Sequence, residues 1–175
     1  MRELILRGNQ VYIRQPEFSE MGYIRRLWAD AKTMKEVGGP IHLTDEQAKA
    51  WYEKMFGDEG QKTNLFCLIY DLEGDPIGEV SFHRYDEKTK TAGFNIKVEA
   101  NKRRKGNGRE ALELLLNYYF NVFGGEVMQD DVRITNIIGQ KMLLNSGFAH
   151  IGTTPEAFIV QMTKEEFNKR KISSN

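Results

Sequence analysis

VEANKRRKGNGR, residues 98–109, is the stretch of this chain that decides its fold. It follows an alternating run, GFNIKV at residues 93–98, and it precedes a segment in which apolar side chains recur at helical spacing: Leu112, Leu115, Leu116 and Tyr119. The first pattern is typical of a strand and the second of an amphipathic helix. Residues 98–109 are therefore predicted to form a glycine-containing turn between a strand and the N-terminus of a helix.

The predicted turn has the chemistry of an anion-binding loop. The first amides of a helix lack intrahelical partners and lie at the positive end of its dipole, so they can hold a phosphate. Gly106 and Gly108 remove the Cβ atoms that would keep an anion at a distance. Further amides and positive charges would come from Arg103, Arg104, Lys105, Asn107 and Arg109. A solvated connection without a ligand is the competing interpretation, because short glycine patterns also match by accident.

A second motif lies further along the chain, at residues 136–148, which read NIIGQKMLLNSGF. Its asparagine, its small residue at position 139 and its closing Gly-Phe resemble a pattern of the GNAT superfamily, the acetyl-coenzyme A-dependent N-acetyltransferases. Residues 103–108, RRKGNG, fit the coenzyme loop of that family, Arg/Gln-x-x-Gly-x-Gly/Ala. The chain resembles most closely the branch with ribosomal-protein N-terminal acetyltransferases, and its last segment is similar to aminoglycoside acetyltransferases.

The resemblance implies an α/β (α+β) fold, with a mixed, mostly antiparallel sheet of about seven strands, flanked by about four helices and splayed at the coenzyme strand. It implies acetyl-CoA as the co-substrate, held by the loop and by the strand before it. Ile96 and Val98 would supply the strand contacts, and the backbone N–H of Val98 would point at the thioester carbonyl. Asn136 would contact the pantetheine, serve as a helix N-cap, or do both.

The remaining patterns agree with one N-acetyltransferase domain over residues 1–175. Strands are predicted at 11–14, 65–70, 76–85, 93–98 and 126–133, with two more inside 148–163. Besides the helix after the glycine turn, helices are predicted at 19–35, 44–56 and 136–145. Thr44 and Gln47 have the spacing of a capping box at the start of the second of these. The polar tail, residues 164–175, is expected to fray.

Composition limits the compartment and the partners. Lysine plus arginine and aspartate plus glutamate each number 25, so the formal charge is zero and no overall field favours nucleic acid. No apolar stretch is long enough to span a bilayer, and the N-terminus lacks a secretory signal, so no membrane partner is expected. The single cysteine, Cys67, lies in an apolar run, which favours a reducing cytoplasm. The three histidines lack metal-ligand spacing, so no metal is expected. A homodimer is compatible with the resemblance.

Acetyl transfer to an amine sets the chemical demands on the site. A primary ammonium has a pKa near ~10.4, so it must lose a proton before it attacks, and a carboxylate can take that proton directly or through water. Asp131 and Glu99 are the candidates for this general base, by resemblance, and Glu79 is a weaker third. Each is also compatible with a solvated or salt-bridged carboxylate. The acceptor would be the primary amine of a small molecule or a protein N-terminus.

One position departs from the family pattern. Leu143 stands where many members carry a tyrosine that protonates the leaving thiolate. Water, Tyr85 or Tyr118 would then have to supply that proton. The departure leaves a second function open, in which the chain is a non-catalytic acyl-CoA binding or sensing module.

Overall fold

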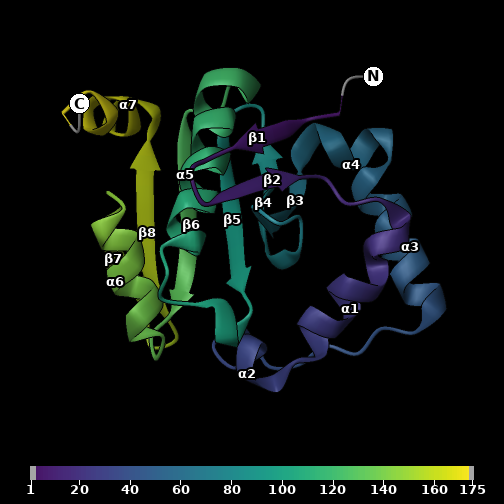
Figure 1. Cartoon of the computed structure of the whole chain (residues 1–175). Coiled ribbons are helices and arrows are strands. Elements are labelled where there is room, and N and C mark those ends of the chain that lie inside the picture. Colours follow the sequence, from purple (N-terminus) through teal and green to yellow (C-terminus); the bar gives the residue numbers. More distant parts are fainter. Residues whose placement is uncertain (1–2, 174–175) are drawn as a thin grey trace.

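A single eight-stranded sheet organises the chain in the computed structural model, which describes residues 3–173 (Figure 1). Its strand order is β1-β2-β3-β4-β5-β6-β8-β7, and every neighbouring pair is antiparallel except β5 and β6. The strands are β1 (Ile5–Arg7), β2 (Val11–Arg14), β3 (Leu65–Asp71), β4 (Pro76–Asp86), β5 (Thr91–Val98), β6 (Val127–Arg133), β7 (Ala149–Thr153) and β8 (Ala157–Thr163). The predicted fold class is confirmed, with one strand more than the sequence indicated.

The additional strand is β1, which pairs with β2 from Ile5↔Arg14 to Arg7↔Tyr12. With three residues it is too short to show an alternating pattern, so periodicity alone could not find it. It extends the sheet at the edge beyond β2, where the chain enters the fold.

The helices lie between and around these strands. They are η1 (Phe18–Glu20), α1 (Met21–Ala29), α2 (Ala31–Met34), α3 (Asp45–Phe56), α4 (Asp58–Thr63), η2 (Ala100–Lys102), α5 (Asn107–Tyr118) with a π-helical turn η3 (Tyr119–Phe123), α6 (Ile137–Asn145) and α7 (Lys164–Ser173). The capping box predicted for α3 is confirmed, since Gln47 N donates to Thr44 Oγ1 at 3.1 Å and Thr44 N donates to Gln47 Oε1 at 2.9 Å. The short helix α4 was not predicted.

The helix predicted over 19–35 is wrong in its continuity, because the chain breaks it at Asp30. The backbone of Asp30 is extended, with φ −77° and ψ 111°, and its carboxylate accepts a hydrogen bond from Thr33 N at 3.2 Å. Aspartate favours such N-cap positions because its oxygen satisfies an amide that the helix leaves without a partner. The result is two helices, α1 and α2, in place of one.

Each face of the sheet has its own core. Side chains alternate along a strand, so Cys67 and Ile69 of β3 face α5, whereas Phe66 and Leu68 face α1 and α3. The apolar stripe of α5 predicted from the sequence is fully buried, and its members Leu112, Leu115, Leu116 and Tyr119 are each at most 1% exposed. The thiol of Cys67 lies in the α5-side core, where burial raises its pKa to about 12, so it is an inert packing group.

The tail from residue 164 was expected to fray, and that expectation is wrong for the described residues. Residues 164–173 form α7, which begins with a reciprocal cap between Thr163 and Glu166. Phe167 is 1% exposed and packs against Phe120, with ring centroids 5.5 Å apart. One aromatic side chain thus fixes a segment whose other residues from 164 to 170 are all polar. Residues 174–175 of the predicted tail lie outside the described part of the chain.

Among the helices of residues 3–173, none combines the length and the apolar character needed to cross a bilayer.

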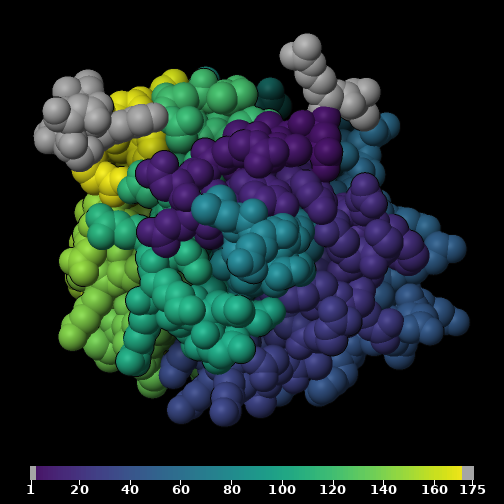
Figure 2. Space-filling model, in the orientation of Figure 1, coloured from purple at the N-terminus to yellow at the C-terminus, as the bar shows by residue number. Residues whose placement is uncertain are grey.

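The loop that follows β5 lies on the surface between the β1–β2 hairpin and α2 (Figure 2). Contacts from this loop and from α5 to both neighbours, described below, hold it there.

Candidate active site

A gap opens in the sheet between β5 and β6. Within residues 3–173, pairing of these two strands is limited to Thr91↔Val127 and Ala92↔Met128. Phe94 directs its N–H toward β6, where it donates to Asp130 Oδ2 at 2.7 Å. Because backbone polar groups alternate sides along a strand, Ile96 and Val98 also face the gap. The splayed coenzyme strand expected from the sequence is therefore present, and both of its predicted contact residues border the opening.

The N-terminus of α5 lies directly over this strand. Its N-cap is Gly106, with φ 80°, a conformation that glycine adopts without strain. A Cβ added at Gly108 would lie 3.2 Å from Val98 Cγ2 and 3.5 Å from Ile96 Cδ1. No side chain of the described chain caps this helix end. The first-turn amides, including those of Asn107 and Gly108, are therefore free to bind an anion. A larger residue at position 108 would push the start of α5 away from Val98 and Ile96.

The four basic residues that the sequence assigned to phosphate binding differ in their contacts. Arg103 is committed to the fold, since its Nε donates to Val98 O at 2.9 Å and an Nη donates to Thr33 O at 2.8 Å. Arg109 likewise donates to Asn145 O at 3.2 Å. All four side chains are exposed, but Arg104 and Lys105 make no hydrogen bond or ion pair within residues 3–173. Arg103 thus braces the loop against α2, and Arg104 and Lys105 are better placed to turn toward a phosphate.

Asn136 is the N-cap of α6. Its Oδ1 accepts a hydrogen bond from Gly139 N at 2.9 Å. This contact supports the helix-capping role that the sequence allowed, and it leaves contact with a pantetheine as a prediction. The capping contact also explains the small residue of the second motif, because a Cβ at Gly139 would lie 2.5 Å from Asn136 Nδ2.

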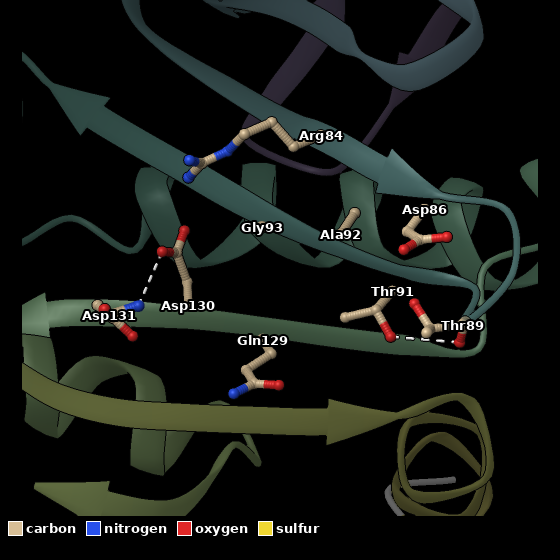
Figure 3. Close-up of a pocket in the computed structure, with 9 residues that line it drawn as sticks. All are labelled: Arg84, Asp86, Thr89, Thr91, Ala92, Gly93, Gln129, Asp130 and Asp131. Carbon is tan, nitrogen blue, oxygen red and sulfur yellow. Dashed lines mark hydrogen bonds between the residues drawn. The ribbon is translucent and has the colours of Figure 1, made fainter.

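A pocket lies at the point where β5 and β6 part, on the face of the sheet opposite α5 (Figure 3). We call it the apex pocket, and its lining includes Arg84, Asp86, Gly93, Gln129, Asp130 and Asp131. Arg84 reaches across β5 toward the carboxylate of Asp130 in Figure 3. The pocket carries three carboxylates against one guanidinium, so its charge favours a cation.

Asp130 holds the apex together. Its two carboxylate oxygens accept from Phe94 N and from Asp131 N, each at 2.7 Å. Burial raises the pKa of Asp130, and the two amides and Arg84 oppose that rise. The residue therefore joins the two strands at the point where their own pairing ends.

The sequence-based candidates for the general base lie in two different places. Asp131 is exposed and lines the apex pocket. Glu99 lines a second pocket, between α1, α2 and η2, where its carboxylate accepts from Tyr23 OH at 2.8 Å. Because Asp131 and Glu99 line separate pockets, a single acceptor nitrogen would be served by one of them and not by both.

The carboxylate of Glu79 has a structural role. It is 1% exposed, and its carboxylate accepts from Lys97 Nζ and from Trp28 Nε1, each at 2.7 Å. Both oxygens are thereby engaged, and the residue ties α1 and β5 to β4. This arrangement makes Glu79 a positioning group for the sheet, which weakens the case for it as a proton acceptor.

The candidates for the thiolate's proton donor lie on the other face. Tyr85 packs on Phe123, with centroids 4.8 Å apart, and Tyr118 packs against the α5-side core. Leu143 is 3% exposed within that same core. Neither tyrosine lines the apex pocket or the pocket beside Glu99 described above, so water remains as the third candidate from the sequence, and its role stays a prediction.

One cluster outside these pockets has metal-binding chemistry. Asp71, Glu73 and Asp75, in the β3–β4 turn, place carboxylate oxygens within 4.8 Å of one another. Asp71 Oδ1 also accepts from the amides of Glu73 and Asp75, each at 3.0 Å, which is the geometry of a capped turn. The cluster therefore has a sufficient structural explanation.

A family model for the acetyltransferase (GNAT) domain matches residues 10–149 of the chain. The chain belongs to the GNAT family. The match spans the β2–β4 region, the splayed strand, the glycine turn and α6, so it covers the geometry described above as well as both sequence motifs. No curated protein sequence matches the chain.

Solved structures of GNAT proteins share its fold. Spermidine N-acetyltransferase from Vibrio cholerae, solved with CoA and spermine, has a TM-score of 0.84 at 16% identity and covers 92% of this chain and 99% of its own. A GNAT-family acetyltransferase from Bacillus anthracis has a TM-score of 0.76 at 17% identity, covering 93% and 99%. Apo FdhC, a nucleotide-linked sugar GNAT, has a TM-score of 0.81 at 19% identity, covering 99% and 97%. Such identities establish the fold and leave the acceptor open.

The apex residues Arg84, Gly93 and Asp130 were not identified from the sequence. The resemblance favoured Asp131 over Asp130, because it indicates a carboxylate five residues before Asn136. The one signal in the sequence is a glycine inside a strand pattern, which often marks a close approach of other groups. Their proximity depends on which strands are neighbours, and local patterns do not encode that.

Proposed function

We propose that this protein transfers an acetyl group from acetyl-CoA to a primary amine. The observation that carries the proposal is the junction of the splayed strand β5 with the uncapped N-terminus of α5, where Gly108 sits on Val98 and Ile96. In this proposal the amides of Gly106 to Gly108, with Arg104 and Lys105, hold the pyrophosphate. When bound, acetyl-CoA supplies an activated acyl group and a thiolate leaving group.

The backbone of the splayed strand has two tasks in this account. The backbone groups of Ile96 and Val98 that face the gap form hydrogen bonds with the pantetheine arm, in the way that a sheet edge binds an added strand. The N–H of Val98 stabilises the negative charge that develops on the thioester oxygen. Arg103 keeps Val98 in place by its bond to Val98 O, and Asn136 fixes the start of α6 beside the slot.

The charge of the apex pocket suggests the class of acceptor. Asp86, Asp130 and Asp131 face a single guanidinium, that of Arg84, so a substrate with more than one ammonium group is favoured over a neutral or anionic one. The fold similarity to a spermidine N-acetyltransferase is compatible with this class. A small aliphatic polyamine is therefore the first acceptor to test, and a basic protein N-terminus is the second.

Two carboxylates are candidates for the general base that takes the proton from the substrate amine. Asp131 in the apex pocket and Glu99 in the second pocket remain candidates, acting directly or through water. Asp131→Asn is expected to impair turnover if the amine reacts at the apex, and Glu99→Gln if it reacts beside Tyr23. Coenzyme affinity should change little in either variant.

Release of free coenzyme A thiol tests the function. The purified protein is incubated with acetyl-CoA and a panel of spermidine, spermine, an aminoglycoside and peptides with free N-termini. We expect thiol release above hydrolysis with at least one polyamine, and acetylated amine in equal amount by mass spectrometry. Asp58→Asn, an exposed aspartate on α4, is the control for the aspartate variants.

A second function is favoured by one observation, the buried Leu143 at the position where many relatives carry a tyrosine. A non-catalytic acyl-CoA binding or sensing module would bind the coenzyme and release no thiol with any amine of the panel. That combined result would overturn the enzymatic proposal and support the sensing module.

A further inference from the structure

The two faces of the splayed strand differ in what they leave open. On the α5 side, Val98 and Ile96 lie under the start of the helix, where a Cβ added at Gly108 would be 3.2 Å and 3.5 Å from their side chains. Val98 also belongs to the α5-side core. With the coenzyme arm in the gap, a substrate amine therefore approaches the thioester from the opposite face, on which α1 lies.

The two neighbours of Val98 in the sequence point to this opposite face, because side chains alternate along a strand. Lys97 is paired there, since its Nζ donates to Glu79 Oε1 at 2.7 Å. An ammonium group has no lone pair with which to take a proton, and Glu79 is saturated by its two donors. Glu99, the other neighbour, carries the carboxylate that is available to a substrate amine.

Distance along the sheet separates Glu99 from the other candidate base. Glu99 directly follows Val98, whose N–H is proposed to bind the thioester oxygen. In the parallel register of β5 and β6, Asp131 is level with Asn95. That level is about 10 Å along the strand from Val98, at ~3.3 Å per residue, and the splay adds to the separation. A general base must reach its proton by one hydrogen bond or through one water, so the geometry favours Glu99.

Tyr23 of α1 holds the carboxylate of Glu99. Its hydroxyl donates to Glu99 Oε1 at 2.8 Å. Burial raises the pKa of Tyr23, and the bond to Glu99 raises it further, so the hydroxyl keeps its proton at neutral pH and remains a donor. The backbone N–H of Glu99 donates to Ile77 O at 2.9 Å. Glu99 is thus fixed at its main chain and at one carboxylate oxygen.

The second oxygen of this carboxylate is left for a ligand. Glu99 Oε2 makes no hydrogen bond within residues 3–173. Glu99 and Tyr23 line the second pocket, whose volume is about 400 Å³. Small-molecule sites commonly have volumes in this range. Room for a ligand and a free acceptor atom therefore occur together beside Val98.

We propose that Glu99 takes the proton of the reacting amine, directly or through one water, and that Tyr23 is the residue that positions its carboxylate. The proposal rests on the acetyl-transfer function and assigns the proton acceptor of that same site. The apex carboxylates are too far away for this step and remain available to a further ammonium group of a longer acceptor.

The proposed step balances in protons and electrons. Glu99 Oε2 takes one proton from the ammonium, and the lone pair so formed makes the C–N bond. The thioester C–S bond breaks, and its electron pair leaves with the thiolate. The new amide nitrogen loses a second proton, which goes to the thiolate directly or through water. Glu99 then releases its proton to solvent.

Variants of the pair test the proposal through kcat. Glu99→Gln removes the proton acceptor and should lower kcat about 100-fold or more. Tyr23→Phe removes only a hydroxyl and should lower kcat about tenfold, the effect of one hydrogen bond to a charged group. Acetyl-CoA affinity should change less than about twofold in both, which also verifies that they fold. Tyr52→Phe is the matched control with unchanged kcat, because the hydroxyl of Tyr52 donates to Pro16 O instead.

Tyrosine ¹³Cζ NMR provides a test that needs no turnover. Tyr23→Phe assigns the Tyr23 signal among the seven tyrosines of the chain. We expect this signal to move in Glu99→Gln, because the hydroxyl then donates to a neutral amide or to water. A signal that stays in place would contradict the contact even if the protein proves to be no enzyme.

The double variant separates positioning from a structural effect. Because Tyr23 is proposed to act through Glu99, Tyr23→Phe should cause no further loss of kcat in the Glu99→Gln background. Losses that multiply would contradict the positioning role. Full turnover in Glu99→Gln, beside an active wild type, would overturn the proposal while the acetyl-transfer function stands. A wild type that releases no thiol with any amine would overturn both.

Discussion

At the scale of single residues, one carboxylate joins the β1–β2 turn to the start of α5, two segments about 100 residues apart in the sequence. Glu110, in the first turn of α5, accepts from the amides of Asn9, Gln10 and Val11 at 2.7, 2.7 and 2.8 Å. A Cβ at Gly8 would lie 2.6 Å from the carboxyl carbon of Glu110, so a larger residue there would displace this side chain. The β1–β2 turn and the start of α5 are thus held together by charge-assisted hydrogen bonds.

Glu110→Gln is expected to lower the free energy of unfolding by about 1–3 kcal/mol, because a neutral amide cannot accept three backbone donors as well as a carboxylate does. Urea denaturation measures the effect. Glu59→Gln, which removes one exposed ion pair with Lys62 on α4, is the control and should cause no measurable change. Equal stability of both variants would show that the three contacts do not stabilise the fold.

At the scale of elements, the sequence predicted which helices and strands exist better than it predicted the residues at which they end. The glycine turn, the helix α5 and the α6 motif were found because each carries a local pattern of turn residues or apolar spacing. The end of the β5–β6 ladder at Ala92 and Met128 was not found, since it depends on the register of strands distant in sequence. The break at Asp30 was missed because an N-cap aspartate also fits inside a helix pattern.

The helix α7 provides the test at this scale. Phe167→Ala is expected to lower the free energy of unfolding by about 3–5 kcal/mol, because it removes a buried aromatic ring from the α5-side core. Phe18→Ala, at a position that is 52% exposed, should cost much less. Both are measured by urea denaturation monitored by circular dichroism. A negligible effect of Phe167→Ala would mean that the tail frays after all.

At the scale of the whole molecule, the sequence predicted the GNAT family, the fold class and a glycine turn between β5 and α5, and it did not predict the apex pocket. Gly106 and Gly108 stand close together in the sequence, so their turn could be read from a local motif. The apex pocket brings together Arg84, Gly93 and Asp130 from three strands, and only the folded sheet makes them neighbours. The same fold occurs in a spermidine N-acetyltransferase and in a nucleotide-linked sugar GNAT, so the fold alone does not specify the acceptor.

The central claim is that acetyl-CoA binds where Gly108 lies on Val98 and Ile96. Calorimetric titration of the wild type and of Gly108→Trp with acetyl-CoA tests it most directly, with thermal unfolding to verify that the variant folds. We expect micromolar, one-to-one binding by the wild type and none by the folded variant, because the indole would occupy the position of the pyrophosphate. Absence of binding by the wild type, or equal affinity of the two proteins, would contradict it.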